Sequence, residues 1–165
     1  MSFTQIKSKS QSERGFTIVE LLIVIVVIGI LAAITIVSYT GITARANTNA
    51  SKGNASTFIK KAELYLNDGT TNRYPITADE LTLAANSGKS WYLTGLTINY
   101  SGVALTAAPA NSATIRVAKC AAATAANQAA ITGSNISGLQ VFSYDYVNSQ
   151  EVPVNVGNTT SCPTS

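Results

Sequence analysis

Apolar residues fill one long stretch near the start of the chain and become sparse and periodic after it. Between Leu21 and Val37, only Gly29 and Thr35 interrupt a continuous run of apolar side chains. A helix over residues 16–39 would be roughly 36 Å long, which exceeds the hydrocarbon core of a bilayer at about 30 Å. The pattern therefore predicts a membrane-spanning helix over residues 16–39.

A polar segment with three basic residues and one acidic residue precedes this run. Basic residues beside a membrane span stay on the cytoplasmic side, so we expect residues 1–15 inside and residues 40–165 exported. A cleavable secretory signal has a shorter apolar core, and a small-residue cleavage site follows it promptly. Neither feature is found here, so we expect the apolar segment to be retained.

One carboxylate, Glu20, lies near the start of the apolar run. An ionised carboxylate costs about 2.5–3.5 kcal/mol at the centre of a membrane helix on insertion scales, and less near its end. Glu20 therefore needs a partner, or it lies close enough to the interface to reach water. The residues alone leave both interpretations open.

Helical periodicity continues beyond the apolar run. Apolar residues recur at helical spacing from Ala55 to Leu66, and Asn67-Asp68-Gly69 provides a stop. We predict one helix from Phe16 to about Asn67, whose second half packs on a globular head. The pattern Thr77-Ala78-Asp79-Glu80 is that of a capping box, which predicts a short second helix to about Ala85.

From Trp91 onward, short β-rich runs alternate with Gly, Asn and Ser. These runs predict strands at residues 91–94, 96–100, 113–119 and 139–147. Residues 121–130 are alanine-rich and fit either a short helix or a loop, and residues 152–165 are predicted to be a turn-rich tail. The expected fold is α+β, with a long N-terminal α-helix packed against a small antiparallel β-sheet of three or four strands.

The N-terminal residues resemble a known family. Gly15-Phe16-Thr17, with Glu20 five positions after the glycine and Ile-Leu-Ala-Ala-Ile at residues 30–34, is similar to the class III signal of type IV pilins and the related pseudopilins. The resemblance implies a pilin-like fold. It also implies cleavage between Gly15 and Phe16 by a membrane prepilin peptidase, followed by N-methylation of the new Phe16 amine.

The chemistry of such a site can be derived from its residues. Cleavage would create a positive α-amine at Phe16, and Glu20 could neutralise the amine of an adjacent subunit in a helical filament. Glu20 is therefore expected to serve assembly rather than folding. Many pilins carry a proline in a stretch resembling AIPxY, where this chain has Ile36-Val37-Ser38-Tyr39. Without that proline, we expect no kink at this position.

The two cysteines, Cys120 and Cys162, both fall in the exported part of the chain. A bridge between them would suit an oxidising exterior and would stabilise the head by about 4 kcal/mol on the chain-entropy argument. In the resembling family, a disulfide often delimits a C-terminal loop. The alternative is two unpaired thiols in a reducing environment.

Composition argues against catalysis and against strong binding of nucleic acid. The chain has no histidine, and its acids show neither metal-loop nor paired-acid spacing, so we expect no enzyme activity, cofactor or metal. Removing residues 1–15 leaves eight basic and seven acidic residues, so the net charge falls from +3 to +1. The bases of the head are scattered along the sequence, which allows at most weak DNA binding through repeated sites in a filament.

The favoured function is that of a structural subunit of a type IV pilus, which supports adhesion, motility or DNA uptake. On this interpretation residues 1–15 are a cleaved leader, residues 16–39 form the membrane and filament-core segment, and residues 40–165 include the exported head. The chain resides in the cytoplasmic membrane and then in an extracellular pilus. Its partners are further copies of itself, the prepilin peptidase, the pilus assembly machinery, the membrane, and host or abiotic surfaces.

Two alternatives remain open from the sequence. A pseudopilin of a type II secretion or competence system shares every N-terminal feature, although no acid-rich calcium-binding loop is found near the C-terminus. A single-pass membrane protein whose exported head binds a ligand without polymerising is the alternative from another class. Retention of residues 1–15 would favour that last interpretation.

Overall fold

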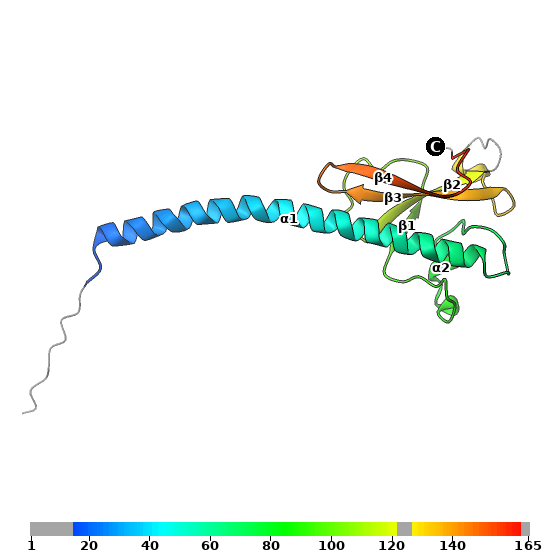
Figure 1. The fold of residues 1–165 in the computed structure, drawn as a ribbon, viewed down its shortest axis with the longest axis horizontal. Helices are drawn as coiled ribbons and strands as arrows, with labels where there is room; N and C mark the ends of the chain where they lie inside the picture. The colour runs from blue at the N-terminus through cyan, green and yellow to red at the C-terminus, as the bar shows by residue number, and fades with distance from the viewer. Residues whose placement is uncertain (1–14, 122–126, 163–165) are drawn as a thin grey trace, which may run out of the picture. The chain divides into compact units, whose positions relative to one another are not determined.

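One α-helix, α1 (Ile18–Leu66), accounts for most of the N-terminal part of the chain (Figure 1). The computed structural model describes residues 15–121 and 127–162. The predicted helix from Phe16 to about Asn67 is confirmed to within two residues at each end. By their internal contacts, the residues form two units that meet between Thr40 and Gly41.

The described part of the first unit is almost entirely an apolar stretch of helix whose side chains are not buried against other elements. Every described side chain in it is exposed, from 48% for Val27 to 89% for Phe16 among the large apolar residues. An 18-residue window of α1 reaches a mean hydropathy of 3.2, which is long and apolar enough to cross a membrane. A helix that is apolar on all sides requires an apolar environment all round it.

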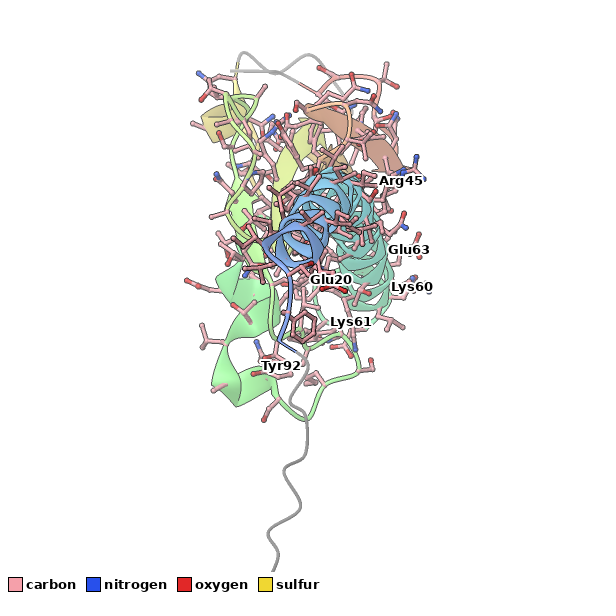
Figure 2. All side chains as sticks on the ribbon, turned by 90° about the vertical axis from the view of Figure 1, so that its left-hand side faces the viewer. Glu20, Arg45, Lys60, Lys61, Glu63 and Tyr92 are labelled. Atoms are coloured by element: carbon pink, nitrogen blue, oxygen red, sulfur yellow. A yellow bond between two sulfur atoms is a disulfide. The ribbon has the colours of Figure 1, made fainter. Side chains whose placement is uncertain are left out.

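The second unit, which we call the head, begins at Gly41 and packs the remainder of α1 against a sheet. One stripe of α1 is buried, at the helical spacing of Thr48, Ser51, Ala55, Phe58, Ala62 and Tyr65. The opposite side is polar, and Lys60 and Glu63 project from it into solvent (Figure 2). The periodicity of residues 55–66 is therefore explained by packing on one face.

The sheet has four strands in the order β1-β2-β3-β4 (Figure 1). The strands are β1 (Thr97–Tyr100), β2 (Thr114–Ala121), β3 (Ile136–Asp145) and β4 (Gln150–Gly157). β3 is antiparallel to both of its neighbours, β2 and β4. The fold is thus the expected α+β arrangement, with a mostly antiparallel sheet on a long helix. The core joins Phe58 of α1 to Ile115, Val117, Leu139 and Val141 of the sheet.

Two details of the predicted sheet are wrong. β1 pairs with β2 in parallel, because residues 101–113 form a crossover long enough to bring the chain back in the same direction. Residues 91–94 are not a strand. Trp91 and Leu93 are buried at a spacing of two, which imitates strand alternation, but the Leu93 N–H donates to Leu81 O at 2.9 Å rather than to a neighbouring strand.

The tail also contains an unpredicted strand. β4 occupies residues that were expected to be turn-rich, and it pairs with β3 over its full length. Only Val156 of β4 is buried, and Pro153 interrupts the β pattern. Proline is compatible with a strand at the edge of a sheet, because one side of that strand forms no hydrogen bonds to a neighbouring strand. An exposed edge strand therefore leaves little apolar signal in the sequence.

The second helix is shorter than predicted. α2 (Asp79–Thr82) ends because Leu83 is extended, and a 3₁₀ turn, η1 (Ala84–Asn86), follows. Only half of the expected capping box forms, since the Glu80 carboxylate accepts from the N–H groups of Ile76 and Thr77 while no side chain caps the helix. In the alanine-rich segment, residues 122–126 lie outside the described residues, and a 3₁₀ turn, η2 (Gln128–Ala130), follows them.

A buried ion pair fixes the crossover to the sheet. Arg116 of β2 is 4% exposed and binds the Glu151 carboxylate of β4 through Nε and Nη2, at 2.9 and 2.7 Å. Its Nη1 donates to Ser101 O at 3.0 Å, and its guanidinium lies 3.5 Å from the centre of the Phe142 ring. One side chain therefore holds together three strands and the start of the crossover.

Candidate processing and assembly site

The first turn of α1 is closed by a capping box between Thr17 and Glu20. The Glu20 carboxylate accepts from the Thr17 N–H at 2.9 Å and from the Thr17 hydroxyl at 2.8 Å. The Thr17 hydroxyl in turn accepts from the Glu20 N–H at 3.2 Å. These reciprocal bonds satisfy two N–H groups that would otherwise lack partners at the start of the helix.

The cap gives Glu20 a local role that the sequence analysis missed. The spacing Thr17-Ile18-Val19-Glu20 is the same as that of the box identified at Thr77, so the signal was present in the sequence. A carboxylate in the first turn also interacts favourably with the positive end of the helix dipole. Among the ion pairs between described residues, none includes Glu20. Its charge is therefore stabilised by hydrogen bonds and remains available to a cation.

The peptide bond expected to be cleaved lies just outside this cap. Gly15, Phe16 and Thr17 precede the helix, and Phe16 is 89% exposed. A Cβ at Gly15 would contact nothing within 4 Å. The fold itself therefore does not require glycine at this position, and any such requirement would come from an enzyme that binds this segment closely.

α1 continues without interruption where many pilins carry proline. Ser38 donates its hydroxyl to Ile34 O at 3.0 Å, and Thr40 donates to Val37 O at 2.9 Å. These bonds satisfy the two hydroxyls within the helix itself, which suits a segment expected in lipid. The prediction that the helix keeps its backbone hydrogen bonds through residues 36–39 is confirmed, because α1 is continuous there.

A disulfide joins Cys120 to Cys162 and ties the end of the described chain to the sheet. Cys120 is fully buried at the end of β2. Beside it, the Ala121 N–H donates to Ser161 O at 2.8 Å in an isolated antiparallel bridge. The bond and the bridge together close a segment that contains β3 and β4.

We expect the Cys120–Cys162 bond in protein recovered from the cell surface, because both residues are in the head, which we expect to be exported, and each cysteine has only the other as an intramolecular partner. Peptide mapping without reductant should recover the two cysteine peptides linked. The same digest after reduction serves as the control. Two freely alkylated thiols in native surface material would contradict this expectation.

Comparisons with known proteins agree with the site. A family profile for the prokaryotic N-terminal methylation motif matches residues 10–36. Two fimbrial proteins of Pseudomonas aeruginosa are each 36% identical to the chain over 89 residues. The match covers 48% of this chain and 58% of each relative, so it spans less than two thirds of their length. No solved structure matches the chain. The chain therefore carries the prokaryotic N-terminal methylation motif, and its resemblance to the type IV pilin and pseudopilin family is confirmed.

Proposed function

We propose that this chain is the structural subunit of a type IV pilus, inserted in the membrane as a prepilin, cleaved after Gly15 and polymerised through its apolar N-terminal helix. The observation that carries the proposal is the first unit of α1, whose apolar side chains are all exposed in the isolated chain. The matched methylation motif covers the start of the same helix.

The exposed apolar side chains suit this helix to a lipid bilayer before assembly and to a bundle of identical helices afterwards. Burial of apolar surface is worth about 25 cal/mol per Å², so a helix with apolar side chains on every side is strongly unfavourable in water. A bilayer covers such a helix before assembly. A bundle of identical helices covers it equally well afterwards, because each copy offers the same apolar surface. Extraction from lipid into a filament therefore exchanges one apolar environment for another.

The N-terminal end of the helix supplies the charged groups for assembly. Cleavage before Phe16 removes a segment rich in charge, which could not enter an apolar filament core, and leaves one α-amine. Glu20 then carries the nearest charge of opposite sign in the chain. In an assembled filament, we expect the Glu20 carboxylate to bind the Phe16 amine of an adjacent copy, which neutralises both groups in a low dielectric.

The mature protein is expected to begin at Phe16. Mass spectrometry of filaments sheared from cells should show the loss of residues 1–15 and the gain of one methyl group. Detection in sheared surface filaments also separates a pilus from a pseudopilus, which is not expected to extend from the cell. Native protein that still begins at Met1 or Ser2 would contradict the proposal and favour a membrane-anchored binding protein.

A matched pair of glycine variants tests the processing step separately. Gly15→Leu should leave the fold intact, since the position is open, but should block cleavage because the enzyme must approach this backbone closely. Gly29→Ala is the control, since a Cβ there also meets nothing within 4 Å and the position is remote from the cleaved bond. Normal processing of Gly15→Leu would show that the cleavage site lies elsewhere.

A further inference from the structure

A cavity of about 290 Å³ opens in the head, where the end of α1 meets the loops around α2. Its walls include Tyr65 and Asp68 from the end of the helix, Thr71 and Glu80 from the next segment, and Lys89 and Trp91 from the loop before β1. Ligand sites commonly start at about 300 Å³, and a water molecule occupies about 30 Å³. The cavity is thus larger than a water site and suits one small molecule.

Trp91 brings an unsatisfied donor to this cavity. Its side chain is 6% exposed, and its indole N–H has no acceptor in hydrogen-bond geometry among the described residues. The Asp68 carboxylate lines the same cavity, and its pKa is lowered, first by the hydroxyl of Thr70 and then by this indole. A buried donor without an acceptor is costly, and a ligand group that accepts from the Trp91 N–H would remove that cost.

A second unsatisfied group lies in the same wall. The Thr71 hydroxyl is buried and has no partner in hydrogen-bond geometry among the described residues. A hydroxyl can both donate and accept, whereas the indole N–H can only donate and the ionised Asp68 can only accept. A ligand that fits this lining must therefore both donate and accept at closely spaced positions.

The charges of the cavity cancel in pairs. Lys89 Nζ lies 3.8 Å from the Asp68 carboxylate, and Arg73 forms an ion pair with Glu80. Burial would raise the pKa of Glu80, but hydrogen bonds, first from Arg73, outweigh it and lower the pKa, so Glu80 remains ionised. The lining itself holds two acids, Asp68 and Glu80, and one base, Lys89. Arg73 compensates Glu80 from outside the lining, so neither an anion nor a cation gains net charge compensation here. The lining favours a neutral ligand.

The cavity also has an aromatic wall. Tyr65 and Trp91 pack edge to face, with ring centres 5.0 Å apart and planes at 82°. Aromatic rings offer apolar contact beside polar groups of the same side chains. A ligand with C–H groups on one side and hydroxyls at its edge would match both parts of the lining.

We propose that this cavity binds one neutral saccharide unit, with a ligand hydroxyl placed between the Trp91 N–H and the Asp68 carboxylate. That hydroxyl accepts from Trp91 and donates to Asp68, and a neighbouring hydroxyl pairs with Thr71. The unit can be a free sugar or the exposed residue of a longer saccharide. The inference does not rest on filament formation, because every group belongs to the head of one chain.

Trp91 is the only tryptophan, so its indole N–H gives one resolved signal in a ¹⁵N-correlated NMR spectrum. The full chain in a micelle of a sugar-free detergent should be titrated with methyl glycosides of common hexoses and with maltotriose. A saturable shift of the indole signal supports the proposal. A stronger response to maltotriose than to methyl glucoside would identify a longer saccharide as the source.

Sodium acetate, sodium sulfate and glycine serve as probes of the other ligand classes. A saturable response to any of these, with none to the sugars, would overturn the proposal, as would no saturable response to any probe. Asp68→Ala should weaken the sugar response at least about tenfold, because it removes a charged hydrogen-bond acceptor. Asp79→Ala, an exposed acid outside the cavity lining, is the matched control and should leave the response unchanged.

Discussion

Replacing Glu20 with alanine is expected to abolish surface filaments while leaving the subunit processed and in the membrane. Removing one partner of a buried ion pair costs about 3–5 kcal/mol, which is more than a hundredfold in association constant for each added subunit. Membrane insertion should not suffer, because the substitution removes a charge from the apolar segment. The amount of sheared filament, compared with the membrane fraction, measures the effect.

Two further variants separate the charge of Glu20 from its role in the cap. Glu20→Gln keeps an acceptor for the Thr17 N–H but removes the charge, so filaments should fall as they do with alanine. Thr17→Val removes the hydroxyl that bonds Glu20 and keeps the carboxylate, so filaments should persist. Normal filament yield from Glu20→Gln, in cells without the native copy, would show that the carboxylate acts only as a helix cap.

Replacing Glu151 with alanine is expected to destabilise the head by about 3–5 kcal/mol, because it leaves the Arg116 charge buried without a carboxylate. The side chains of Arg116 and Glu151 are only 4% and 10% exposed, so water cannot take over the lost contacts. Denaturant unfolding of the full chain in micelles, followed by the fluorescence of Trp91, measures the change in unfolding free energy.

An exposed ion pair of the same chain provides the control. Lys89 and Asp68 lie 3.8 Å apart, and the Lys89 side chain is 53% exposed, so Lys89→Ala should cost less than about 1 kcal/mol. A double variant, Arg116→Met with Glu151→Leu, should recover much of the stability lost in Glu151→Ala, because no buried charge remains. A loss below about 1 kcal/mol in Glu151→Ala would show that Arg116 finds other partners or reaches water.

The long helix could be predicted from the sequence because two strong signals coincide. The apolar run exceeds the length of an ordinary core helix, and the buried stripe of residues 48–65 keeps a helical period. The strands were harder to predict, because their pairing depends on residues far away in the chain. Local periodicity in the sequence predicts neither the parallel pairing of β1 with β2 nor the edge position of β4.

The candidate site shows the same division between local and distant information. The reciprocal bonds of Thr17 and Glu20 depend on neighbours three residues apart, and a search for capping boxes would have found them. The cavity beside Trp91 brings together residues from the end of α1, the segment that follows it and the loop before β1, so no local pattern predicts it. The sequence pattern instead predicts a strand that begins at Trp91. Burial of every second residue, as at Trp91 and Leu93, occurs both in strands and in this loop.

The position of β4 at the end of the chain has a consequence for the order in which an exported head can mature. β4 carries the carboxylate for Arg116 and covers one edge of β3, and the cysteine that pairs with Cys120 follows it. A chain that has emerged from the membrane only as far as β3 therefore exposes an unpaired strand edge, a guanidinium without its counter-ion and a free thiol. If the head is exported in this order, all three hazards end only when the segment from β4 to Cys162 has followed, so the head is most vulnerable to proteases and to mispairing before β4 has docked.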